Sequence, residues 1–146
     1  MPRPAQRHAT LALILAAHAA PLAAAPNFEK EIWPILNTKC VDCHRAPYEE
    51  NGRKKEPKAG LRLDGAWAIL KGSENGAVLK PGDSAKSALY EVVTLPEDDD
   101  MFMPPKGDPL TDAEKKLLKE WIDARADFGG RPGNTEGEPA ETAAEK

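Results

Sequence analysis

Two cysteines three positions apart, followed at once by a histidine, constrain this chain more than any other feature. Cys40, Cys43 and His44 stand in the stretch KCVDCHRAP, and the 146-residue chain has no further cysteine. The other two histidines, His8 and His18, lie near the N-terminus. One short segment must therefore carry whatever chemistry the two thiols perform.

The first 25 residues have the composition of a secretory signal peptide. Arg3 and Arg7 carry the only formal charges there, and the apolar run that follows is interrupted by His18 and Pro21. This run is shorter than the roughly 20 residues that a helix needs to span a bilayer. We therefore expect a signal peptide over residues 1–25, a periplasmic or otherwise exported mature chain, and no membrane span after cleavage.

The mature chain is expected to be acidic. Loss of Arg3 and Arg7 with the signal peptide takes the formal net charge from -4 to -6. Such a surface repels the phosphate backbone, and no basic stripe with interleaved aromatic residues offers an exception. Nucleic acid is therefore excluded as a partner.

Apolar residues at helical spacing predict a short helix that begins at Asn27, a candidate N-cap. Its apolar positions are Phe28, Ile32, Ile35 and Leu36. Pro34 is expected to kink or end this helix, because proline has no N–H donor and crowds the preceding turn. The helix delivers the chain to Cys40.

The middle of the chain predicts short helical pieces. "LRLD" at residues 61–64 is a candidate extended piece, and residues 66–71 are expected to make one or two helical turns. After a turn at Pro81 and Gly82, Asp83 or Ser84 is expected to cap a second helix. Its apolar positions are Leu89, Val92 and Val93.

The C-terminal helix has the clearest signal. It begins at Thr111, where TDAE is a capping box, and is expected to stop at Gly129 and Gly130. Its apolar stripe contains Leu117, Leu118, Trp121, Ile122 and Ala126. Residues 131–146 contain no large apolar residue, so we expect a disordered acidic tail there.

The segment from Arg45 to Gly60 is polar, contains several prolines and glycines, and is predicted to be a surface loop. Its basic residues are Arg53, Lys54, Lys55 and Lys58. They indicate either a solvated loop or a docking patch for an acidic partner. Because strand signals are nearly absent, the sequence predicts one all-α domain with long loops over residues 26–130.

Cys40, Cys43 and His44 form the C-x-x-C-H pattern of c-type haem attachment. Two thiols on one helical turn can reach two neighbouring vinyl groups, and the following histidine can bind the iron. A thioredoxin-like site would need a βαβ pattern, which the sequence does not show. A zinc site would need four ligands, but the mature chain has no further Cys or His. A plain disulfide over so short a loop would stabilise little.

The far side of the iron has few candidate ligands. His8 and His18 leave with the signal peptide, so a second histidine is excluded within one mature chain. Met101 and Met103 remain, both in DDDMFMPPKGDPL before the last helix. We choose Met103 because two prolines follow it directly and stiffen the backbone.

Four ordered blocks give the chain a resemblance to a known family. They read IWPILNTKCVDCH, AGLRLDG, PGDSAKSALYEVV and MPPKGDPLTDAEKKLLKEWIDARAD, and they run from about Glu31 to Ala126. In this order they resemble the Planctomycete-type cytochrome c domain, a branch of the class I cytochromes c. The resemblance implies N- and C-terminal helices packed around a covalently bound haem.

The resemblance also implies roles for single residues. Cys40, Cys43, His44 and Met103 match the thioether cysteines, the proximal histidine and the distal methionine. Leu61, Leu63 and Trp121 are implied as walls of the haem pocket, and the PGDSAKSAL block precedes a helix over the same pocket. The chain departs from the family at Arg45, where glycine is usual, and in the longer loop from Arg45 to Lys58.

These observations together predict an exported monohaem c-type cytochrome that carries single electrons between redox partner proteins and is not itself an enzyme. We expect one haem c, attached through Cys40 and Cys43, with its iron bound by His44 and Met103. Two alternatives stay open. A five-coordinate haem that binds or senses a small ligand would leave Met103 unbound, and a C-x-x-C disulfide oxidoreductase would keep both thiols free of haem.

Overall fold

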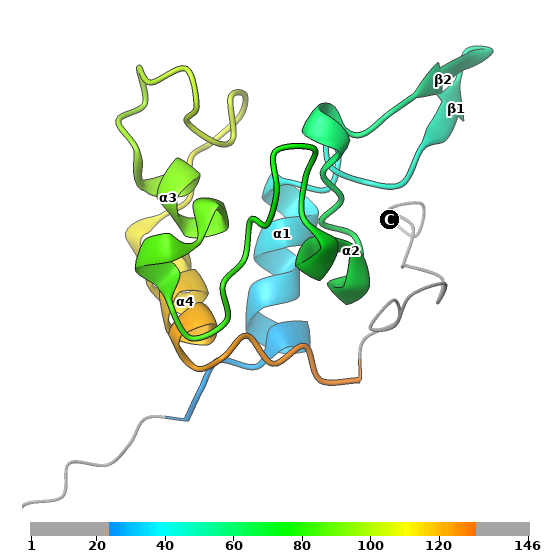
Figure 1. Cartoon of the computed structure of the whole chain (residues 1–146). Coiled ribbons are helices and arrows are strands. Elements are labelled where there is room, and N and C mark those ends of the chain that lie inside the picture. Colours follow the sequence, from blue (N-terminus) through cyan, green and yellow to red (C-terminus); the bar gives the residue numbers. More distant parts are fainter. Residues whose placement is uncertain (1–23, 131–146) are drawn as a thin grey trace, which may run out of the picture.

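The computed structural model describes residues 24–130. The predicted signal peptide lies outside this range except for its last two residues, and the predicted acidic tail lies wholly outside it. Within the range, four α-helices, three short helical turns and one β-hairpin are connected by loops (Figure 1). No helix of the described part is both long and apolar enough to cross a membrane.

The N-terminal helix begins as predicted after Asn27, whose side chain accepts a hydrogen bond from the backbone of Lys30. A π-helical turn, Phe28–Ile32, leads directly into α1, Trp33–Lys39. Pro34 does not end the helix, because it occupies the first turn of α1, where its missing donor is tolerated. The irregularity appears instead as the wider turn before it, and the apolar positions of both segments are buried.

The last helix, α4, spans Asp112–Asp123 and has the predicted capping box between Thr111 and Glu114. It ends earlier than expected, well before Gly129. Arg125 and Ala126 take positive φ angles of 77° and 53°, so the chain turns back before the glycines. The indole of Trp121 donates to the carbonyl of Asp127 at 2.8 Å, which holds this turn against the helix.

Three aromatic rings join the two ends of the domain. Phe28, from the N-terminal π-helical turn, lies 5.3 Å from Trp121 and 4.9 Å from Phe128 between ring centroids. Trp121 and Phe128 meet edge to face at 5.1 Å. All three side chains are buried, so this cluster packs the start of the N-terminal helix against α4.

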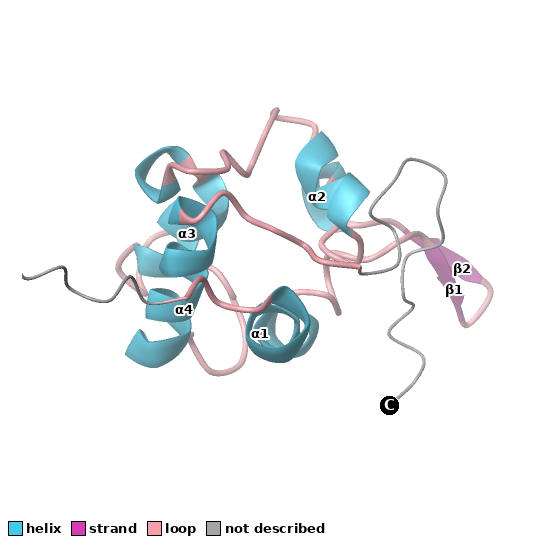
Figure 2. Ribbon diagram, turned by 90° about the horizontal axis from the view of Figure 1, so that it is seen from below, coloured by secondary structure: helices cyan, strands magenta, loops and turns pink. Residues whose placement is uncertain are grey.

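Two shorter helices complete the helical part of the domain. The helix α2, Ala66–Lys71, confirms the prediction of one or two turns, whereas residues 61–64 form no strand. The next helix, α3, spans Ala88–Thr94 and begins later than predicted, because Ser84–Lys86 form a separate 3₁₀ turn. Seen from below, α1, α3 and α4 lie together, with α2 on the other side of α1 from α4 (Figure 2).

The prediction of an all-α fold is wrong. Helices take up about 40% of the described residues, and the expected loop after His44 contains an antiparallel hairpin, so the chain forms a small mixed domain. Strand β1, Tyr48–Glu50, pairs with β2, Arg53–Lys55. In Figures 1 and 2 the hairpin stands out from the helices.

The two turn residues explain why the hairpin forms. Asn51 and Gly52 have φ angles of 52° and 70°, and an Asn-Gly pair with positive φ at both positions favours a two-residue hairpin. The strands also place Glu49 opposite Lys54 and Glu50 opposite Arg53, and such cross-strand pairs of opposite charge stabilise a ladder.

Asp123, the last residue of α4, ties this helix to the turn before α3. Its carboxylate accepts from the backbone N–H of Ser84 at 2.9 Å and from Lys119 Nζ at 2.6 Å. The Lys119 ammonium is the main cause, and the Ser84 donors the second, of a pKa that falls from 3.8 to about 2.

Asp123→Asn is expected to lower the free energy of unfolding at neutral pH. Because the folded pKa lies below the ordinary value, the contribution of Asp123 is fully present above pH 3.8 and is lost as the pH falls through about 2. Urea unfolding between pH 7 and pH 2 should show a gap between wild type and variant that closes towards pH 2. Asp98→Asn, in an exposed loop, serves as the charge control, and a gap independent of pH would contradict this account.

Candidate functional site

The segment from Cys40 to His44 continues the end of α1 as a tight turn. The backbone N–H groups of Cys43 and His44 both point to the carbonyl of Cys40, at 3.2 and 3.0 Å. Val41 is fully buried and anchors the turn in the core. Cys40 is half-buried, Cys43 is exposed, and both are free thiols. The turn thus presents two unlinked thiols and a half-buried imidazole within five residues.

The imidazole of His44 is oriented by the backbone of a distant segment. Its Nδ1 lies 3.3 Å from the carbonyl oxygen of Leu61. Because a carbonyl can only accept, Nδ1 carries the hydrogen and Nε2 keeps its lone pair on the neutral ring. Burial lowers the pKa of His44 below 6.5, although hydrogen bonds to the backbone of Leu61 and Lys58 offset part of this effect. His44 is therefore held in the neutral form that binds metal.

The segment 58–64 pins the backbone of the motif at further points. The N–H of Lys58 donates to the carbonyl of Cys43 at 3.1 Å, and the N–H of Leu63 donates to the carbonyl of His44 at 2.7 Å. Leu63 is buried, and Leu61 packs against the core. The block AGLRLDG, a mark of the family resemblance, thus forms the support of the histidine.

Asp64 is a site residue that the sequence analysis missed. Its side chain is only 1% exposed, and it accepts from the backbone N–H of Ala46 at 2.8 Å. It also binds Arg62 through Nε at 3.0 Å and Nη2 at 3.3 Å. The only signal for it in the sequence is an acid two positions after an arginine within an apolar stretch, and many exposed acids share that pattern.

The thiol of Cys40 is held in the protonated form. Burial, and to a lesser degree the neighbouring Cys43, raise its pKa to about 12, against a small opposing effect of Lys39. The nucleophilic thiol of a disulfide oxidoreductase needs the opposite shift, because only the thiolate attacks. The environment of Cys40 therefore disfavours that alternative.

The two methionines of the loop before α4 differ in their surroundings. The side chain of Met101 is 60% exposed, whereas Met103 is half-buried and packs against the hydrophobic core. The N–H of Met103 donates to the carbonyl of Val92 at 2.9 Å, which fixes this part of the loop to α3. Burial and backbone support thus favour Met103 over Met101 as a ligand.

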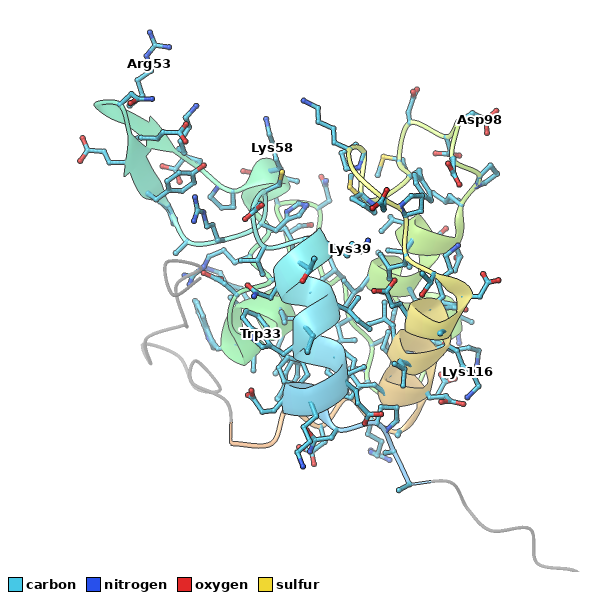
Figure 3. All side chains as sticks on the ribbon, turned by 180° about the vertical axis from the view of Figure 1, so that it is seen from behind. Trp33, Lys39, Arg53, Lys58, Asp98 and Lys116 are labelled. Atoms are coloured by element: carbon cyan, nitrogen blue, oxygen red, sulfur yellow. The ribbon has the colours of Figure 1, made fainter. Side chains whose placement is uncertain are left out.

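The end of α1 and the methionine loop lie at the same end of the molecule. Lys39 Nζ, one residue before Cys40, donates to the carbonyl of Asp108 at 3.1 Å. Figure 3 shows Lys39 near the upper end of α1, between the hairpin that carries Arg53 and the loop that carries Asp98. Cys40 and Met103 also pack against the same core cluster. The chain thus brings the motif and the loop to one end of the domain.

The donor groups of this site fit a haem better than a metal ion held by protein side chains alone. Within residues 24–130, no group of three or more His, Cys, Asp or Glu side chains could hold a metal ion, so the zinc alternative has no ligand set there. Free thiols on one turn, a neutral imidazole and a half-buried thioether are the groups that a covalently attached haem requires.

Breaking the Arg62–Asp64 pair is expected to destabilise the motif. Arg62→Leu leaves a buried carboxylate without its charged partner, and we expect a loss of about 2 kcal/mol in the free energy of unfolding. Chemical denaturation followed by circular dichroism measures it. The control is Lys54→Ala, which removes the exposed pair with Glu56 and should cost less than about 0.5 kcal/mol. Equal losses in the two variants would contradict the role given to Asp64.

Comparison with known proteins bears on the identity of this site. A search of curated proteins finds no match. Among solved structures, a chain of Kuenenia stuttgartiensis hydrazine synthase matches with a TM-score of 0.42 and 20% identity, over 79% of this chain. The chain spans only 18% of the length of that protein. So slight a likeness does not define the fold.

A family model described as Planctomycete cytochrome C matches residues 40–107. This segment begins at the first cysteine of the motif and includes His44, Asp64 and Met103. The match agrees with the resemblance carried by the sequence blocks. Residues 40–107 therefore match the Planctomycete cytochrome c family, and this match supports a c-type cytochrome.

Proposed function

We propose that this protein is an exported one-electron carrier with a single haem c, attached through Cys40 and Cys43 and bound by His44 and Met103. The observation that carries the proposal is the orientation of His44. Its Nδ1 is hydrogen-bonded to the Leu61 carbonyl, and the residue follows two free thiols in the sequence. When bound, haem supplies an iron that changes between the ferric and ferrous states by one electron.

The two cysteines provide the attachment. Cys40 and Cys43 would hold the haem through two thioether bonds, because addition of a thiol to a vinyl group needs no oxidant. Cys40 is half-buried against the core and Cys43 is exposed, so the attachment lies at the boundary between core and solvent. An attachment edge near solvent suits exchange of electrons with a partner protein.

His44 and Met103 are both neutral ligands in this proposal. A thioether in place of a second imidazole raises the reduction potential. If both ligands stay bound in each oxidation state, no position remains for a substrate, which separates a carrier from a five-coordinate sensor. Burial of Met103 and its hydrogen bond to Val92 support a ligand that stays in place.

The partners are proposed to be an electron donor and an electron acceptor. The basic residues of the hairpin offer little net positive charge to attract an acidic partner, because the acidic residues of β1 lie opposite the basic residues of β2. Lys54 pairs with Glu56 at 2.6 Å, and Lys55 pairs with Glu50 at 3.5 Å. These pairs favour the interpretation of a solvated loop over that of a basic docking patch.

Met103→Ala is expected to remove the sulfur ligand without removing the haem. The purified ferric protein, produced with the cytochrome c maturation machinery, should lose the weak far-red absorption band that reports sulfur–iron ligation. Met101→Ala is the matched control from the same loop and should keep the band.

The opposite result in the two methionine variants would assign the ligand to Met101. A spectrum that neither substitution changes would contradict sulfur ligation and favour the open-site alternative.

The cysteines can be tested by covalent retention of haem. After denaturation and electrophoresis, wild type should keep haem on the polypeptide, because thioether bonds survive unfolding. Cys40→Ala/Cys43→Ala should lose it completely, and each single variant should retain part. Ser73→Ala is a neutral control. Haem that leaves the denatured wild-type chain would overturn the attachment proposed here.

A further inference from the structure

Arg45, the residue directly after the proposed iron ligand His44, has unusual surroundings. Its guanidinium carbon lies 3.7 Å from the ring centroid of Tyr48, as in a cation–π contact. Its Nε is buried and has no hydrogen-bond partner. Within residues 24–130 no carboxylate forms an ion pair with this guanidinium. A buried donor without an acceptor is rare in folded proteins and calls for an explanation.

The backbone on both sides of Arg45 is fixed. The carbonyl of His44 accepts from the N–H of Leu63 at 2.7 Å, and the N–H of Ala46 donates to Asp64 at 2.8 Å. Asp64, the acid in this network, is already engaged by Ala46 and Arg62. These hydrogen bonds therefore hold the backbone of Arg45 in place next to His44.

Tyr48 fixes the other end of the side chain. It is the first residue of β1 and faces Lys55 across the hairpin. The hairpin thus supplies the aromatic surface on which the guanidinium rests. Half-burial also reduces the screening that water gives to an exposed arginine.

We propose that Arg45, positioned by Tyr48, raises the reduction potential of the haem through the positive charge that it carries one residue after the proximal histidine. The proposal rests on the function proposed above. A fixed positive charge disfavours the additional positive charge of the ferric state, and groups around a metal ligand tune its potential in this way. The residue acts through charge and position and touches no substrate.

The test is a spectroelectrochemical titration of the holoprotein. Arg45→Gln should shift the midpoint potential downward, whereas Arg45→Lys should keep most of the wild-type value. The control is Arg53→Gln, which removes the same charge from the exposed end of the hairpin. At about 1 M salt, where the Debye length is roughly 3 Å, the shift of Arg45→Gln should persist and any shift of Arg53→Gln should vanish.

The pair Tyr48→Leu and Tyr48→Phe provides an independent test. The leucine variant removes the ring under the guanidinium and should lower the potential, whereas the phenylalanine variant keeps a ring and should not. If Arg45→Gln loses the far-red sulfur band, its ligands have changed, and this tyrosine pair decides. Equal potentials in the two tyrosine variants would overturn the proposal.

Two further outcomes distinguish a failure of the role proposed for Arg45 from a failure of the proposed electron-carrier function. If Arg45→Gln keeps the sulfur band and loses stability but has the wild-type potential, Arg45 only fastens the hairpin, and the proposal is overturned. If wild type itself lacks the sulfur band or a covalent haem, the proposed function fails first, and the tuning role falls with it.

Discussion

The pairing of the segment 58–64 with residues 43–46 is the constraint on which the candidate site depends. Backbone hydrogen bonds from Lys58 and Leu63, together with the carboxylate of Asp64, hold the turn after the cysteines. The same segment supplies the carbonyl that orients His44. Without it, the imidazole would sit at the end of a short helix with no fixed direction and no chosen tautomer.

Two kinds of interaction determine the position and the orientation of the motif. Apolar burial places the motif, because Val41 is fully enclosed and Cys40 packs on the core. Hydrogen bonds then set the orientation, since each of them fixes a direction that apolar contact leaves free. The aromatic cluster of Phe28, Trp121 and Phe128 lies elsewhere in the same core, and its role is to join the two ends of the chain. The residues that join the two ends of the chain are therefore different from those that orient His44.

Local signals in the sequence predicted the features that depend on neighbouring residues. The capping box at Thr111 and the Asn27 cap are local, and the structure confirms both. The signal for the hairpin is also local, because Asn51–Gly52 favours a two-residue turn, but the charges and prolines around it predict a polar loop.

Other features could not be predicted from neighbouring residues because they depend on contacts over long distances in the chain. Nothing near Asp64 indicates that it reaches Ala46, and nothing near Leu61 indicates that its carbonyl meets an imidazole. The early end of α4 likewise depends on Phe128 returning to Trp121, which overrides the glycine stop signal. The roles of Met103 and the cysteines remain predictions from motif and ligand supply, supported for Met103 and Cys40 by packing against the core.

The hairpin has a consequence for how this chain can be extended. Its two ends return to the motif, because the Cys43 carbonyl and the Lys58 N–H are only 3.1 Å apart and close the excursion between them. The turn at Asn51 and Gly52 lies at the other end of the ladder from Tyr48 and Lys55, and Figure 3 shows its neighbour Arg53 at the outer end of the hairpin. A peptide inserted at that tip would therefore extend a loop whose two ends are already joined by a hydrogen bond. The tip of the hairpin is therefore a suitable point for immobilisation on an electrode or for fusion to a second module, because it is separate from the residues that orient His44.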